Sequence, residues 1–442
     1  MALVLDIVYG STTINLNDNG CTVCWETYAP KVGRGETVTE SVELILVGED
    51  IVEIIQSIET AFTVARRTQA DGIGERVYAY ILPHGYTNDR RSEIIDGKVD
   101  LDNKALSWIE RHQHARAKIA WTRTNYWEDA DELQLALENS SVVTPTTNPL
   151  VIYNHADAGA GHDFSAAIPA DEMEGDLPTP AVIEIANSTN NGSLLDDIYV
   201  GHLAPRANYN PPAVTALVFE GSGSVDANCS GGEYANLPWT DDEENQLETW
   251  SIDVHQYRAH TFKILARFRA GFAYTDLWLQ VRLLSGSELL SETRWNLMTA
   301  SEVLQPIGNL KIPPYLHRAY VDTGQLTLAL YEKRAAGAGE INLDYLAGLP
   351  LDSWRHYRAI SGLAYGETLV DRPDDTALIT EYVDGGWTVN KVTHLVEEGE
   401  PVMLQPGVEN VLYFLHNLTG GTAPIVRTST IQVSYRPRRQ TL

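Results

Sequence analysis

The chain has 442 residues, 43% of them hydrophobic, so it is too long for one ordinary core and predicts two or three globular domains. It carries 60 acidic side chains against 32 lysines and arginines, a formal charge of −28. That balance opposes sequence-specific or general binding of nucleic acid, which requires a basic surface. No run of about 18 apolar residues is present, so we expect no membrane span.

The first 140 residues combine alternating strands with one strongly amphipathic helix. Residues 1–9 lack the basic segment and cleavage site of a signal peptide, and residues 3–9 predict a first strand. From Asp50 to Thr68, apolar residues recur at i, i+3, i+4 and i+7, which is typical of a helix with one buried face. Asp50 and Glu53 can form a capping box. Alternating runs on both sides of the helix predict strands, so we expect an α+β domain over 1–140.

Residues 141–360 predict an antiparallel β-sandwich. Apolar and polar residues alternate over 262–269, 277–283, 326–331 and 340–346, which places one set of side chains in a core and the other in solvent. Short Gly- and Ser-rich stretches separate these runs, and no long helical pattern intervenes. We therefore predict a mainly β fold.

Residues 361–442 predict further β-strands, which can pack back on the N-terminal domain. The chain closes with a basic tail that contains Arg436, Arg438 and Arg439. We expect these arginines to be assembly contacts with an acidic face of a neighbouring subunit or partner. The alternative is a disordered, solubilising end.

Four aromatic residues are candidate sugar contacts, because an exposed ring offers a flat apolar face beside polar groups. Trp278 has the strand parity of Gln280 and Arg282, which predicts an outward position. The alternative is that most of the aromatic rings in or near the sandwich, which also include Trp250 and Trp354, fill the core or an inter-domain contact. The candidates are Trp239, Tyr274, Trp278 and Trp295.

The sequence offers no motif for catalysis, and we expect no enzymatic activity, no metal and no cofactor. Cys21 and Cys24 have zinc-knuckle spacing, but they lie in a strand-like run, where residues three apart face opposite sides. The acidic stretch 241–244 reads as a solvated loop, with a Ca²⁺ site as the alternative. The many carboxylates show no spacing that selects a glycosidase pair.

Three stretches resemble a known family. Residues 339–351 resemble the last core strand of carbohydrate-binding-like jelly rolls inserted in phage tail proteins. Residues 403–415 and 433–438 resemble the closing strands of such proteins. The layout of 1–140 is similar to the ring-forming domain of siphovirus-type distal tail proteins. The resemblance implies a jelly-roll sandwich over 141–360 and carries no catalytic residues.

The same resemblance implies a structural protein of the phage virion, of the distal tail or baseplate type, assembled in the host cytoplasm. Its partners would be further copies of itself in a ring, other tail proteins, and a glycan of the host surface. In a ring that conducts DNA, an acidic lumen would repel phosphate. One alternative is a non-catalytic carbohydrate-binding protein of a bacterial surface. A β-sandwich glycoside hydrolase ranks last.

Overall fold

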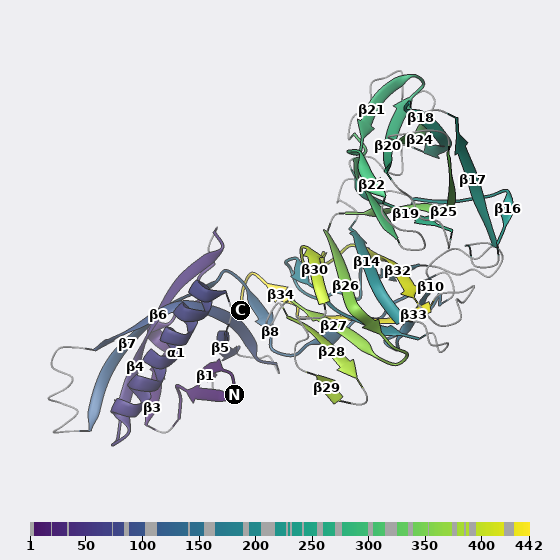
Figure 1. Cartoon of the computed structure of the whole chain (residues 1–442). Helices are drawn as coiled ribbons and strands as arrows, with labels where there is room; N and C mark the ends of the chain where they lie inside the picture. Colours follow the sequence, from purple (N-terminus) through teal and green to yellow (C-terminus); the bar gives the residue numbers. More distant parts are fainter. Residues whose placement is uncertain are drawn as a thin grey trace.

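Most of the residues that the structure describes lie in β-strands, and the strands form three parts (Figure 1). In the portion it describes, the computed structural model has one α-helix, α1 (Ile51–Asp71), and one short 3-10 helix, η1 (Trp25–Thr27). The predicted mainly β fold class is therefore confirmed. The structure describes residues 4–18, 20–32, 35–72, 74–83, 88–101, 113–139, 142–153, 164–188, 194–204, 217–226, 229, 232–240, 243–253, 260–269, 276–298, 304–313, 325–334, 339–351, 353–373, 378–383, 386–388, 395–419 and 428–442.

The N-terminal unit is a nine-stranded antiparallel sheet that lies around α1 (Figure 1). The hydrogen-bonded order is β2-β1-β5-β6-β7-β4-β3, and β8 and β34 join the sheet beside β6. β2 and β3 follow each other in the chain yet form opposite edges, so the sheet curves toward closure around the helix. The strands are β1 (Val4–Tyr9), β2 (Thr12–Asn15), β3 (Cys21–Cys24), β4 (Thr37–Val47), β5 (Val77–Leu82), β6 (Arg90–Leu101), β7 (His114–Thr124), β8 (Trp127–Asp129) and β34 (Arg438–Arg439).

Helix α1 buries the predicted apolar stripe against the concave face of this sheet. Phe62 is fully buried against β6 at Gly97, where an added Cβ would lie 2.4 Å from the ring. The helix ends at Gly72, whose φ of 68° is left-handed and whose N–H donates to the Thr68 carbonyl. Asp50 precedes the helix, but its side chain makes no capping hydrogen bond, so the predicted capping box does not form.

The middle part is a sandwich built from two distant pieces of the chain. Eight of its strands can be numbered 1 to 8 in chain order. In the first sheet four of them pair in the order 1-8-3-6 (β10-β33-β13-β27), and in the second sheet the other four pair in the order 2-7-4-5 (β11-β32-β14-β26). The first sheet contains β9 (Leu133–Gln134), β10 (Leu150–Tyr153), β13 (Val182–Asn187), β27 (Thr368–Arg372), β28 (Leu378–Val383), β29 (Gly386–Thr388) and β33 (Thr428–Tyr435). The second contains β11 (Ser165–Ile168), β14 (Leu194–Leu203), β26 (Ser353–Leu363), β30 (Leu395–Gly399) and β32 (Asn410–Thr419); β12 (Thr179–Pro180) pairs with β31 (Met403–Leu404).

A second sandwich is inserted between β14 and β26 of the first (Figure 1). Numbered in the same way, its sheets repeat the orders 1-8-3-6 (β17-β25-β19-β23) and 2-7-4-5 (β18-β24-β20-β21). The inserted strands are β15 (Leu217–Glu220), β16 (Ser224–Val225), β17 (Glu233–Trp239), β18 (Asn245–Asp253), β19 (Thr261–Phe268), β20 (Leu277–Ser285), β21 (Glu288–Glu292), β22 (Asn296–Met298), β23 (Gln305–Lys311), β24 (Gln325–Arg334) and β25 (Gly339–Pro350).

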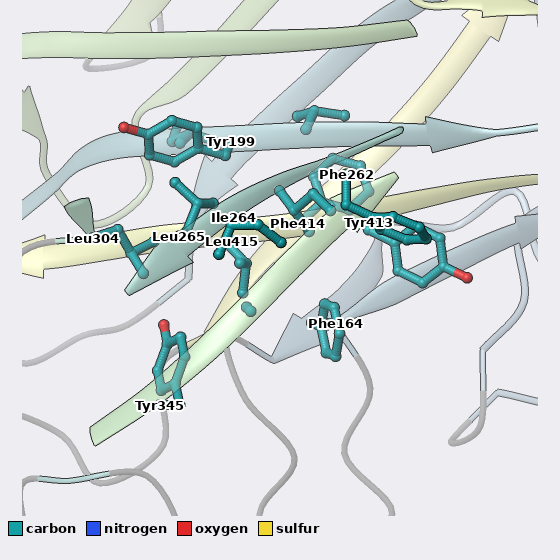
Figure 2. Close-up of a cluster of buried hydrophobic side chains, with 14 of the residues drawn as sticks. Phe164, Tyr199, Phe262, Ile264, Leu265, Leu304, Tyr345, Tyr413, Phe414 and Leu415 are labelled. Atoms are coloured by element: carbon teal, nitrogen blue, oxygen red, sulfur yellow. The ribbon is translucent and has the colours of Figure 1, made fainter. Parts of the chain in front are cut away.

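The two sandwiches share one continuous hydrophobic core. Figure 2 shows Tyr199 and Phe414 of the first sandwich close to Phe262 and Ile264 of the inserted one. Gly201 of β14 lies so close to the end of β25 that an added Cβ would fall 2.7 Å from a backbone carbonyl oxygen. Continuous packing of this kind couples the two sandwiches mechanically.

The strand pairing places the domain boundaries differently from the sequence prediction. The predicted boundary at residue 360 falls inside β26, and most strands of 361–442 complete the first sandwich. Of the described part of 361–442, residues 436–442 return to the N-terminal unit, where β34 pairs with β8 and Leu442 packs on the core. Alternation predicts that a segment is a strand, but it says nothing about a partner as distant as that of β10, which pairs with β33.

Candidate functional site

The structure separates the four predicted sugar-facing aromatics. Trp239 is wrong as a candidate, because it is the last inward position of β17 and is only 4% exposed. Tyr274 lies outside the described residues. Trp278 is 39% exposed on β20, between two buried leucines, so its predicted outward position is confirmed. Trp295 is half-buried just after β21. Two of the four therefore belong to the surface of the inserted sandwich.

Arg282 organises this surface. Its guanidinium carbon lies 4.2 Å from the ring centre of Tyr331 and 5.9 Å from that of Trp295. Its Nε donates to the side-chain oxygen of Gln280 at 2.8 Å and lies 3.3 Å from a Glu292 oxygen. A further ion pair joins it to Glu244. Burial lowers the pKa of Arg282, but the hydrogen bond to Glu244 and the nearby charges leave it raised overall, so Arg282 stays charged.

Apolar side chains extend this surface beside Trp278. Its cross-strand neighbours are Leu297 on β22 and Lys333 on β24. Leu297 is 37% exposed, and Leu289 on the neighbouring hairpin strand β21 is also exposed. Exposed rings and leucines gathered on one sheet are typical of binding surfaces. We define the aromatic face as Trp278, Arg282, Trp295, Leu297 and Tyr331.

The basic tail contacts its own chain. Arg438 Nη2 lies 2.9 Å from Glu128 Oε1, and the guanidinium stacks 4.1 Å above the Tyr126 ring centre. Arg439 Nη2 lies 3.1 Å from Asp129 Oδ2. Arg436 donates to the Ala130 carbonyl. The sequence predicted contacts with a neighbouring subunit, whereas here the three arginines hold residues 126–132, which we call the acidic segment.

The acidic segment also binds arginines of β6. The buried Glu128 is shared by Arg438 and by Arg91, whose Nε lies 3.2 Å from its Oε2. Burial lowers the pKa of Arg91, but the nearby Tyr78 and Glu128 leave it raised above its usual value, so it remains charged. Glu132 pairs with Arg372 of β27 at 2.6 Å. The acidic segment therefore clamps the N-terminal unit to the first sandwich.

Backbone pairing runs along the same clamp. β8 pairs with β34 in the N-terminal sheet, and β9 pairs with β33 in the sandwich. The two segments of the chain that connect the N-terminal unit to the first sandwich therefore run side by side as one antiparallel ribbon. This ribbon fixes the two parts more firmly than a flexible linker would.

The two edges of the N-terminal sheet differ. At β3, Asn17 Oδ1 accepts the Val23 N–H at 3.2 Å and the Asp18 carbonyl accepts the Cys21 N–H at 3.0 Å, so the chain itself covers this edge. Within the described sheet, β2 pairs only with β1. A two-residue turn joins β1 to β2, and the pair of residues that flanks it is hydrogen-bonded between the strands. Thr13 is the next residue of β2, and hydrogen-bonded and non-hydrogen-bonded pairs alternate along an antiparallel ladder, so its backbone N–H and C=O point away from β1.

A groove of about 620 Å³ lies along the open β2 edge. Asp50 and the first turns of α1, through Glu53 and Ser57, form its other wall. Ile14, Val47 and Ile54 provide its apolar part. The lining residues include carboxylates but no lysine or arginine, so the groove is acidic.

A buried hydrogen-bond chain was missed by the sequence reasoning. His202 Nδ1 lies 2.8 Å from Ser353 Oγ, and its Nε2 lies 3.0 Å from Asn410 Oδ1. Although the three residue types could serve catalysis, Ser353 Oγ also accepts the Met403 N–H and Asn410 Oδ1 accepts the Gln405 N–H. The chain of bonds therefore fixes the turn before β32.

Cys21 and Cys24 are the first and last residues of β3. Cys21 is buried and Cys24 half-buried, and burial raises the pKa of the Cys21 thiol to about 12. No group of three or more potential metal ligands was found among the residues the structure describes. Over the same residues, no helix is long and apolar enough to cross a membrane.

Comparison with known proteins finds no matching family model and no matching curated protein. Among solved structures, the phage P2 baseplate in its activated conformation with Ca has 9% identity and a TM-score of 0.29, covering 100% of both chains. The same baseplate with Sr has 9% identity and a TM-score of 0.28, covering 98% of each chain. The subviral particle of infectious bursal disease virus VP2 has 9% identity and a TM-score of 0.20, covering 69% of this chain and 81% of that chain. Similarities this weak carry no argument about the present chain.

Proposed function

We propose that this chain is a structural protein of a phage tail, of the distal tail or baseplate type, which forms a ring through its N-terminal unit. The observation that carries the proposal is the contrast between the covered β3 edge and the open β2 edge beside an acidic groove. An open edge meeting a different surface of the next copy is a heterologous contact, which gives a ring when the rotation closes.

The strand orders support the display part of this proposal. The orders 1-8-3-6 and 2-7-4-5 in both sandwiches fit the paired Greek keys of a jelly roll. We infer one jelly roll from 150–203 with 353–435, and a second one inserted into it. The clamp and the shared core would hold both at a fixed angle outside the ring.

In this proposal the protein acts by assembly and binding and catalyses no reaction. Its partners are further copies of the chain, other tail proteins and a host-surface glycan. It is assembled in the host cytoplasm and functions in the virion tail. It uses no cofactor.

Replacing Thr13 by proline tests the edge contact. Proline removes an N–H that points away from β1, so the β1–β2 ladder keeps its own bonds while the open edge loses a donor. We expect mass photometry to find a multi-subunit particle for the wild-type chain and mainly monomer for Thr13→Pro. Thr13→Val keeps the donor and the strand preference, and should assemble normally. Unchanged assembly of Thr13→Pro would show that β2 is not the contact.

A second candidate function is a non-catalytic carbohydrate-binding protein of a bacterial surface. The aromatic face favours it independently of the N-terminal unit. This function needs no ring, so a wild-type chain that stays monomeric while binding a saccharide would support it over the tail role.

A further inference from the structure

We propose that the aromatic face binds a neutral oligosaccharide that lies along β20. The inference rests on the proposed function in treating the inserted sandwich as the displayed part of the protein. It names the ligand class of that part and the residues that contact it.

The spacing along β20 favours a chain of sugars over a single one. Trp278 and Arg282 lie on the same side of the strand, four residues apart, which separates them by about 13 Å. Trp278 provides an exposed indole at one end, and Tyr331 with Trp295 provides rings around Arg282 at the other. A saccharide chain laid along the strand can place the C–H faces of its rings on both platforms.

The charges of the face favour a neutral ligand. Glu292 and Glu244 balance Arg282, whose guanidinium is further occupied by Gln280 and the Tyr331 ring. An anion would therefore meet carboxylates beside the arginine. Hydroxyl groups can instead donate to these carboxylates and accept from the guanidinium, because a carboxylate has about four acceptor sites and a guanidinium has five N–H donors.

The support beneath the face is pre-organised. The Gln280 side chain is 3% exposed, donates to the Thr293 carbonyl at 2.7 Å and accepts from Arg282 Nε. The Tyr331 hydroxyl donates to Gln246 Oε1 at 2.8 Å. Fixed side chains reduce the entropy lost on binding. A protein partner is a poorer fit, because interface cores are depleted of charged residues and this face places an ion-pair network between its rings.

Binding should be measured on the full chain with cellohexaose, maltohexaose and chitohexaose as neutral probes and a hyaluronan hexasaccharide as the acidic probe. We expect a neutral probe to bind and Trp278→Ala to weaken that binding about tenfold or more, because one stacking platform is lost. Tyr365→Ala is the control, since Tyr365 is an aromatic side chain in a turn of the other sandwich and is 56% exposed, more than Trp278. It should bind as the wild type does.

Three results would overturn the inference: no binding of any neutral probe, tighter binding of hyaluronan, or equal binding by wild type and Trp278→Ala. Capture of a purified tail protein through this face without saccharide binding would also overturn it in favour of a protein contact. Particle mass measured on the same samples separates this test from the tail role. A ring that binds no sugar refutes only the ligand, and a monomer that binds sugar refutes only the ring.

Discussion

Replacing Glu128 by alanine should destabilise the N-terminal unit by about 3–5 kcal/mol. Glu128 is buried and neutralises two guanidiniums, Arg91 from β6 and Arg438 from β34. Both arginines are themselves largely buried, so removal of the carboxylate leaves two desolvated cations facing each other across the clamp. Leaving a buried charge unpaired costs far more than an exposed ion pair contributes.

Hydrogen exchange followed by mass spectrometry measures this effect locally. The amides of β8 and β34 should exchange much faster in Glu128→Ala, because their opening free energy falls with the stability of the clamp. Asp131→Ala is the matched control, because the Asp131 side chain is exposed in the same acidic segment. This substitution should change stability by less than about 0.5 kcal/mol. Equal protection in the Glu128 variant and the wild type would mean that the clamp does not hold the two parts together.

Replacing Phe62 by alanine should cost about 3–5 kcal/mol, because the ring is fully buried between α1 and β6. The contact with Gly97 leaves no neighbouring side chain at that position to fill the cavity. Chemical denaturation followed by the signal of the N-terminal unit gives the change in unfolding free energy. Gln56→Ala, on the exposed side of the same helix, should be close to neutral. A loss under about 1 kcal/mol for Phe62→Ala would contradict the packing described for α1.

Local patterns in the sequence predicted the elements well. The period of α1 identified its buried stripe, and the alternation around Trp278 identified the outward side of β20. Trp239 was misplaced because the region before it reads as a Gly- and Asp-rich loop. The alternation of Ala235, Leu237 and Trp239 is present in the sequence and would have predicted an inward ring.

Pairing between distant segments could not be predicted from these patterns. Arg438 meets Glu128 only because the end of the chain returns to the N-terminal sheet. A basic tail has the same sequence signature whether it serves its own chain or a neighbour. The insertion of one sandwich into another is equally invisible, since strands of both sandwiches alternate in the same way. The groups around Arg282 come from β20, β21, β24 and the residue that precedes β18, and only the strand order brings them together.

Electron microscopy of the purified full-length chain tests the proposed tail role most directly. The account predicts closed rings, with the N-terminal units in contact around the centre and the paired sandwiches projecting outward at one constant angle. Thr13→Pro should abolish the rings, while Trp278→Ala should leave them intact. A wild-type chain that appears only as single particles over a wide concentration range would contradict assembly through the open β2 edge.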